Sequence, residues 1–175
     1  PEGLKVRSWA RPGTAISLLV DRSGSMGGKP LATSAMAAAA VAWRSPSDYS
    51  VIAFGKDVVV AKGQTSMKSS EEVINDVLAL RGFGTTDLAG ALRGAGEQLS
   101  RTRAGRRITV ILSDCRATVA GDVQAAARAL DEVVILAPCG DDAEAQVLAW
   151  QVGARIACID GPSDIPAALQ AVLGD

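Results

Sequence analysis

The sequence predicts an α/β fold of the doubly wound, Rossmann-like class, with a mostly parallel central sheet and helices on both faces. Short apolar runs alternate with helical patterns along the whole chain, as in successive βαβ units with right-handed crossovers. Thr14–Asp21 and Ile108–Ser113 are apolar on both faces, which is typical of buried parallel strands. With 175 residues, the chain is long enough for one full core, so we expect a single domain over 1–175, with 1–13 as a lead-in.

About six strands are expected. They are predicted at 14–21, 49–54, 58–61, 108–113, 133–137 and 155–159. Gly55-Lys56-Asp57 forms a tight turn between the second and third of these runs, which predicts a hairpin. One edge strand should therefore be antiparallel to its neighbour, whereas the others should be parallel.

Helical patterns separate most of the strands. Helices are predicted at 30–44, 70–80, 88–99, 122–130, 142–151 and 164–173. Pro30 suits the first turn of its helix, and Ser45-Pro46-Ser47 ends it. Ser70-Glu71-Glu72 places acidic residues at the positive end of the next helix. Each helix is short, and no apolar stretch is long enough to cross a bilayer.

Composition excludes several classes of function. The net charge of −1 provides no general attraction to nucleic acid or to an anionic membrane. The absence of His excludes Ser-His-Asp and Cys-His catalysis and His-rich zinc sites. The three cysteines are sparse and widely spaced, so we expect reduced thiols, with Cys158 as a small core residue. Cys115 and Cys139 both follow strands and could lie near one another, but we do not expect a disulfide between them.

Oxygen-bearing side chains follow the first strand. Asp21, Ser23 and Ser25 alternate, so their three oxygens can face one side of an extended turn, although Asp, Ser and Gly are also ordinary turn and helix-capping residues. Thr86 adds a hydroxyl in a Gly-rich loop before a helix, and Asp114 ends another buried strand. In doubly wound sheets, ligands bind beyond the carboxyl ends of the strands. The oxygen-only set favours Mg²⁺ or Mn²⁺, with Ca²⁺ as a further possibility.

These separated motifs resemble the metal-ion-dependent adhesion site (MIDAS) of von Willebrand factor A (VWA) domains, and the resemblance covers essentially the whole chain. Asp21-Arg22-Ser23-Gly24-Ser25 is similar to the family's D-x-S-x-S pattern, and Asp114 to its later Asp. Thr86 corresponds to the family's Thr, with Thr85 as the neighbouring candidate. Cys115 stands where many members have Gly. Cys115-Arg116-Ala117-Thr118 is similar to a segment of the bacterial magnesium-chelatase type.

The resemblance implies a metal-dependent protein–protein interaction module and not an enzyme. The two serines would bind the metal directly, Thr86 directly or through water, and the two Asp residues often through water. An acidic side chain of a partner would then complete the coordination shell. Asp87 is expected to be a charge at the start of its helix. Arg22 and Arg116 could steer an acidic partner or could be ordinary surface charges.

Enzymatic alternatives fit the motifs less well. A phosphate-binding loop fails because Ser23 stands at its first Gly and Pro30 at its Ser/Thr position, and a G-x-G-x-x-G pattern is absent after the first strand. A haloacid-dehalogenase-type phosphatase would need Asp at Ser23, and a hydrolase nucleophile at Ser25 lacks both the first Gly and a His base. A metal-dependent, phosphatase-like hydrolase is therefore the least favoured interpretation.

Two biological contexts remain open for such a module. The expected free thiols, the lack of a recognisable signal peptide and the segment at Arg116 favour a cytoplasmic adaptor that works with a MoxR-type AAA+ ATPase. An extracellular adhesion domain is the alternative. A third interpretation is a VWA domain whose metal is only structural.

Overall fold

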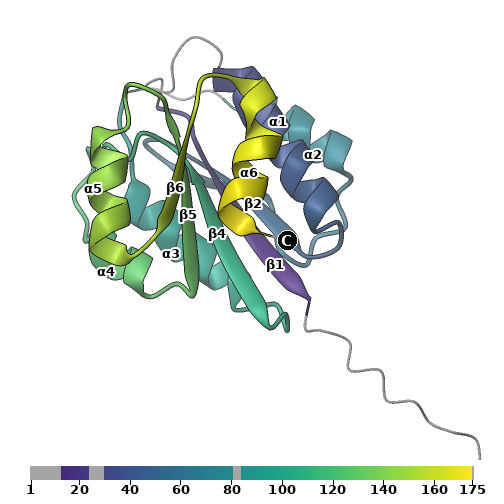
Figure 1. The fold of residues 1–175 in the computed structure, drawn as a ribbon. Coiled ribbons are helices and arrows are strands. Elements are labelled where there is room, and N and C mark those ends of the chain that lie inside the picture. The colour runs from purple at the N-terminus through teal and green to yellow at the C-terminus, as the bar shows by residue number, and fades with distance from the viewer. Residues whose placement is uncertain (1–12, 24–29, 81–83, 175) are drawn as a thin grey trace, which may run out of the picture.

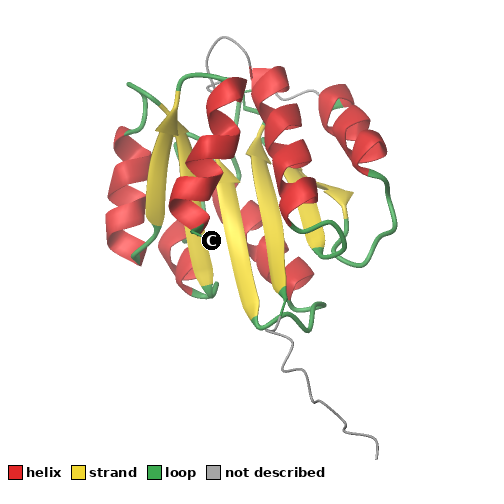
Figure 2. Ribbon diagram, turned by 45° about the vertical axis from the view of Figure 1, so that its right-hand side comes forward, coloured by secondary structure: helices red, strands yellow, loops and turns green. Residues whose placement is uncertain are grey.

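The computed structural model describes residues 13–23, 30–80 and 84–174. Within them, a six-stranded sheet lies between two layers of helices (Figures 1 and 2). The strands are β1 (Thr14–Asp21), β2 (Tyr49–Phe54), β3 (Val58–Lys62), β4 (Arg106–Leu112), β5 (Glu132–Pro138) and β6 (Arg155–Ile159). The helices are α1 (Pro30–Arg44), α2 (Ser70–Ala79), α3 (Leu88–Leu99), α4 (Val123–Arg128), α5 (Ala143–Val152) and α6 (Ile165–Leu173), with a 3₁₀ turn at Pro162–Asp164.

The strand order is β3-β2-β1-β4-β5-β6, and only the β2–β3 pair is antiparallel. The predicted fold class is thereby confirmed, including the antiparallel edge strand. Predicted and observed element boundaries differ by at most two residues. The largest differences occur at β4, which begins at Arg106, and at α4, which ends at Arg128.

Each face of the sheet has its own core. On one face, α1, α2 and α6 cover a cluster that contains Ile16, Leu18 and Val110 (Figure 1). On the other face, α3, α4 and α5 cover a cluster that contains Leu19 and Ile111. Successive residues of β1 and β4 thus point into different cores, and the residues from Ala15 to Asp21 and from Ile108 to Leu112 are all buried. This arrangement explains why these strands are continuously apolar rather than alternating.

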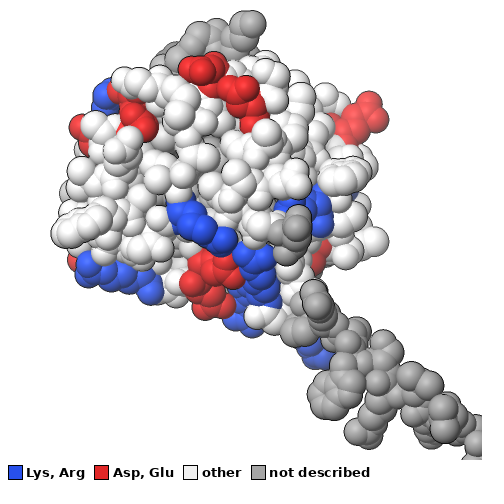
Figure 3. Space-filling view, in the orientation of Figure 1, with Lys and Arg blue, Asp and Glu red and all other residues white. Residues whose placement is uncertain are grey.

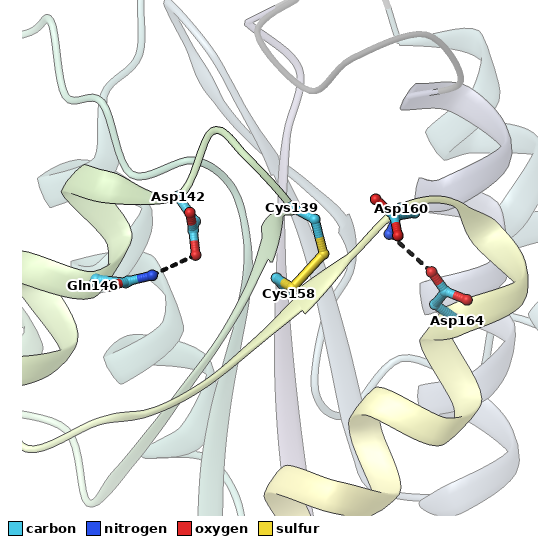
Figure 4. Close-up of a disulfide and its surroundings, with 6 residues drawn as sticks. All are labelled: Cys139, Asp142, Gln146, Cys158, Asp160 and Asp164. Carbon is cyan, nitrogen blue, oxygen red and sulfur yellow. Dashed lines mark hydrogen bonds between the residues drawn. A yellow bond between two sulfur atoms is a disulfide. The ribbon is translucent and has the colours of Figure 1, made fainter.

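The cysteine prediction was wrong for two of the three residues. Cys139 and Cys158 form a disulfide, with their Cα atoms 4.8 Å apart, and Cys158 is exposed instead of being a core residue (Figure 4). The cause is strand pairing. β5 and β6 are parallel neighbours with Ala137 opposite Cys158, and the Cys139 amide donates to Ile159 O at 3.0 Å. Pairing at the sheet edge therefore brings together two residues that are 19 apart in sequence. Cys115 is buried, and its thiol is free, as expected.

No helix among the described residues is long and apolar enough to cross a membrane.

Candidate metal centre

The candidate site lies where the order of strands changes direction. From β1 the chain proceeds to β2 and β3 on one side of the sheet and then returns to place β4 on the other side of β1. β1 ends at Asp21, and β4 is followed by Ser113 and Asp114. Because the two strands are parallel neighbours, their carboxyl ends meet at one edge, which is the usual ligand-binding position of such a sheet.

Asp21 is 1% exposed and is held by hydrogen bonds on both oxygens. Its Oδ1 accepts from the amide of Ser23 at 2.8 Å and from the Ser23 hydroxyl at 2.5 Å. Its Oδ2 accepts from the Ser113 hydroxyl at 2.5 Å. Burial raises the pKa of Asp21, and the nearby charge of Asp114 adds to that rise, whereas the hydrogen bonds from Ser113 and Ser23 oppose it. The environment thus makes the carboxylate charge costly in the absence of a cation.

Asp114 is fully buried, and only one of its oxygens is satisfied. Oδ1 accepts from the Arg116 amide at 3.0 Å. Among the residues that the structure describes, Oδ2 has no hydrogen-bond partner, and Nη1 of Arg116 lies 3.9 Å away. A buried acceptor that lacks a partner is costly and requires an explanation, such as an ion that completes it.

Cys115 adopts a backbone conformation that favours Gly. Its φ is +61°, the left-handed region that L-residues rarely enter. The Ser113 hydroxyl accepts from the Cys115 amide at 2.9 Å, and the side chain packs into the core under α3 and α5. Burial raises the pKa of its thiol, and the charges of Asp114 and Asp21 raise it further, so the thiol stays protonated. The departure from Gly thus leaves a Gly-like turn after Asp114.

Hydrogen bonds connect the Thr86 loop to the loop after β4 at this edge of the sheet. The Thr86 amide donates to the Thr118 hydroxyl at 2.7 Å, and the amides of Thr118 and Val119 donate to Thr86 O at 3.1 and 3.2 Å. Thr86 is 3% exposed, whereas Thr85 is exposed. A Cβ placed on Gly55 would lie 3.5 Å from Thr85 O and 3.9 Å from the Ser23 amide, so the Thr85 loop, the turn after β2 and the segment after β1 come together.

The remaining residues predicted from the sequence differ in their positions and contacts. Ser25 lies outside the described residues. Asp87 caps α3 by accepting from the Gly90 amide at 2.8 Å, which confirms its expected role at the helix start. Arg22 is half-buried and donates to Leu80 O at 2.5 Å, so it braces the loop after α2 and is not a surface charge. Arg116 is half-exposed beside Asp114.

Sequence reasoning did not identify Ser113 and Thr118. Ser113 binds Asp21 and supports the turn at Cys115. Thr118 connects the loop after β4 to Thr86. A signal was available for Ser113, because it is the polar residue between an apolar strand and Asp114. Thr118 carried no comparable signal, since its partner is 32 residues away.

The chemistry of this donor set fits a hard divalent cation. No group of three or more Asp, Glu, His or Cys side chains that could hold a metal occurs in the described part of the chain. Among the described residues, a cation would therefore depend on the hydroxyls of Ser23 and Thr86 together with Asp21 and Asp114. Neutral and acidic oxygens of this kind suit Mg²⁺, Mn²⁺ or Ca²⁺. The unsatisfied Asp114 Oδ2 is the observation that favours such an ion.

Comparison with known families agrees with the geometry. The family model for the von Willebrand factor type A domain matches residues 16–117, which span β1 to the turn after Asp114. The chain belongs to the von Willebrand factor type A domain family. No curated protein sequence matches this VWA domain.

Solved structures share its fold at low sequence identity. Proximal thread matrix protein 1 from the mussel byssus, with a zinc-occupied MIDAS motif, has a TM-score of 0.70 and 14% identity, covering 93% of this chain and 47% of its own. The manganese-loaded TRAP protein of Plasmodium vivax has a TM-score of 0.69 and 15% identity, covering 93% and 74%. An aerotolerance-related membrane protein of Bacteroides fragilis has a TM-score of 0.69 and 16% identity, covering 92% and 97%. The chain thus spans about half of the byssus protein.

Proposed function

We propose that this VWA domain is a metal-dependent protein–protein interaction module, in which Asp21, Ser23, Ser25, Thr86 and Asp114 hold a Mg²⁺ ion. Mn²⁺ or Ca²⁺ could take its place. The observation that supports the proposal is the buried, unpartnered Asp114 Oδ2 beside Asp21 at the switch point of the sheet. A bound cation of this kind would offer a coordination position to an Asp or Glu carboxylate of the partner. The manganese- and zinc-loaded relatives support a divalent ion without selecting Mg²⁺. Among the two threonines, the buried position of Thr86 favours it over Thr85.

The electrostatics of this end of the molecule support a requirement for metal. Asp141, Asp142, Asp160 and Asp164 follow the carboxyl ends of β5 and β6. Figure 3 shows acidic side chains at this end of the visible face and most basic ones in the middle and toward the opposite end, where a further acidic patch lies among them. An acidic rim attracts cations and repels a carboxylate. A partner carboxylate would therefore bind only when a cation changes the local charge.

Ser23→Ala is the sharpest test of the site. It removes one hydroxyl oxygen but leaves the buried carboxylates in place. Asp21→Ala would also strip Ser113 of its acceptor, and its loss of metal binding would be harder to separate from a loss of stability. Ser100→Ala is a matched control, since this hydroxyl donates to Glu97 O at the far end of α3. Calorimetry with MgCl₂ should show lost binding in Ser23→Ala and unchanged binding in Ser100→Ala. Equal Mg²⁺ affinity in both variants would refute the site assignment.

The partner's context is a separate part of the proposal. The segment that begins at Cys115-Arg116 supports an adaptor for a MoxR-type AAA+ ATPase by resemblance alone. The disulfide between Cys139 and Cys158 supports an adhesion domain outside the cytoplasm, because disulfides persist in oxidising compartments. The disulfide also removes one reason to place the protein in the cytoplasm. A pull-down in the presence of Mg²⁺ or chelator, followed by identification of the metal-dependent partner, distinguishes the two contexts.

A binding role is proposed in preference to catalysis. The chain contains no His, so among the proposed metal ligands a general base would be a carboxylate or a hydroxide on the cation. Both carboxylates of the site already accept hydrogen bonds that hold the surrounding turns. Asp21 accepts three hydrogen bonds, and Asp114 fixes the following turn through Oδ1. The hydrolase alternative would gain support if purified protein hydrolysed p-nitrophenyl phosphate and Ser23→Ala abolished the activity.

A further inference from the structure

Arg116 lies at the rim of the candidate metal centre and connects it to the next loop of the sheet. It follows Asp114 by two residues, and its side chain is 48% exposed. Its guanidinium bonds to Asp141 in the loop after β5 and approaches Glu144 in the first turn of α5. The arginine thus extends from the turn after β4 toward α5, directly beside the buried Asp114.

The acidic pair, Asp141 and Glu144, determines which edge of the Arg116 guanidinium can face a further ligand. Nη2 donates to Asp141 Oδ1, and Nε lies 3.5 Å from Glu144 Oε2. These two contacts occupy the edge of the planar group that faces α5. Nη1 lies on the other side, 3.9 Å from Asp114 Oδ2, which is too far for a hydrogen bond. A rigid, planar fork held on one edge presents its remaining N–H groups in a defined direction.

We propose that Arg116 is a specificity-determining residue that donates a hydrogen bond from Nη1 to the second oxygen of the partner carboxylate. This inference rests on the proposed function, since the first oxygen would bind at the cation held by Asp114 and its neighbours. The partner's acidic side chain would then be bound at two points, by the metal centre and by Arg116. Asp141 and Glu144 act as positioning residues that hold the guanidinium in place.

The charges around Asp114 explain why a carboxylate would be selected. With a cation at Oδ2, the Arg116 guanidinium is a second positive charge close to the first, and the two repel one another. A neutral ligand such as water or an amide leaves this repulsion in place. A carboxylate relieves it, because one anionic group touches both positive charges and gains a charge-assisted hydrogen bond. Arg116 should therefore weaken the binding of metal alone and strengthen the binding of metal with carboxylate.

A purely structural role for Arg116 makes a different prediction. If the arginine only joins the loop after β4 to α5, its removal should lower the stability of the domain and weaken both metal and ligand binding. A specificity role predicts opposite changes, with the metal binding more tightly and the carboxylate contributing less. The two roles are therefore separable in one titration.

The test compares Arg116→Gln with the wild-type chain and with Arg128→Gln. Arg128 is an exposed arginine on α4 that donates to Gln151 O, so its substitution removes the same charge away from the site. Free Mn²⁺ is followed by electron paramagnetic resonance during titration, with and without the peptide acetyl-Gly-Glu-Gly-amide. The isosteric peptide acetyl-Gly-Gln-Gly-amide is the ligand control. The ratio of the Mn²⁺ dissociation constants without and with peptide measures the coupling between the two ligands.

Wild type and Arg128→Gln should bind Mn²⁺ more tightly with the Glu peptide, and the Gln peptide should have no effect. Arg116→Gln should bind Mn²⁺ alone about two- to fivefold more tightly, because a nearby positive charge is removed. Its coupling to the Glu peptide should fall by about three- to tenfold, a modest factor because the group is half-exposed. Unchanged coupling in Arg116→Gln would overturn the inference, as would a joint loss of metal affinity and thermal stability. Mn²⁺ binding by wild type without any coupling would instead overturn the proposed function, and the inference with it.

Discussion

Asp114→Asn should stabilise the domain in the absence of metal and remove its response to metal. In the wild-type chain, a carboxylate is fully buried with one oxygen unpartnered, and the charge of Asp21 is nearby. Asparagine keeps the Oδ1 acceptor for the Arg116 amide at nearly the same size. It also removes the buried charge. The substitution should therefore increase the stability of the metal-free domain and remove a proposed metal ligand.

The size of the effect follows from the buried charge, because asparagine leaves a neutral polar group in place of a charged one at the unpartnered position. An unsatisfied buried polar group costs about 1–3 kcal/mol, and a charged one costs more. The half-exposed guanidinium 3.9 Å away offsets part of this cost. We expect Asp114→Asn to raise the free energy of unfolding by about 1–3 kcal/mol in chelator. For a domain of this size, each kcal/mol corresponds to roughly 2–4 °C in Tm.

The assay is thermal unfolding in EDTA and in MgCl₂. At a Mg²⁺ concentration of about 100 times Kd, wild type should gain about 2.7 kcal/mol, and the variant should gain nothing. The stability of wild type relative to the variant should therefore be greater in MgCl₂ than in EDTA. Asp131→Asn, at an exposed acidic residue outside the site, is the matched control and should leave the metal response intact. A variant that is less stable in EDTA and still responds to Mg²⁺ would refute the reasoning.

Three further predictions concern the rest of the domain. Glu132→Gln should lower the free energy of unfolding by about 1 kcal/mol at neutral pH. The hydrogen bonds from Arg106 lower the pKa of Glu132, so the wild-type advantage should be present above the unfolded pKa near 4.5 and should vanish as the pH falls through the lower folded pKa. A series of urea titrations at different pH values measures this change. Ser69→Ala should cost about 1 kcal/mol by urea unfolding, because it removes the capping box that Ser69 forms with Glu72 at the start of α2; an unchanged midpoint would contradict that role. Thiol labelling of denatured protein should modify one cysteine, Cys115, without reductant and three with reductant, whereas three without reductant would contradict the disulfide.

The fold was predictable because local patterns and global pairing agree along this chain. The apolar runs of β1 and β4 indicated strands buried on both faces, and both strands lie at the centre of the sheet. The turn at Gly55-Lys56-Asp57 correctly indicated the antiparallel β2–β3 hairpin. Errors of one or two residues at element ends arise because caps and strand ends depend on neighbours that are distant in sequence. β4, for example, begins two residues early because Arg106 pairs with Thr14.

The site was predictable in part, because its main carboxylates directly follow strands. Asp21 and Asp114 could be placed at one edge once the strands were assumed to be parallel, and the structure brings them together across β1 and β4. Ser113 offered a signal as the polar residue at the end of an apolar strand, but its bond to Asp21 required the strand order. The contact of Thr118 could not be predicted, because it depends on the path of the loop after β4, which has no periodicity of its own.

The disulfide was missed because cysteine spacing carries little information without strand order. Cys139 lies just beyond β5, and Cys158 lies within β6. They meet only if β6 pairs with β5 in one particular register. Cys115 and Cys139 also follow strands, yet Cys115 turns inward in a left-handed conformation and is buried. Counting strands could not distinguish these two pairings.

The charge distribution is the strongest physical reason to expect that recognition depends on metal. The sheet edge combines two buried carboxylates with acidic residues after β5 and β6, and Arg116 is already paired with Asp141. A free acidic peptide should therefore be repelled in chelator, and added salt should weaken this repulsion without creating binding. With a divalent ion, the same edge carries a local positive charge between Asp114 and Arg116. A surface that merely attracted acidic proteins would bind them best in low salt without metal. A salt titration in chelator therefore distinguishes such a surface from a metal-dependent site.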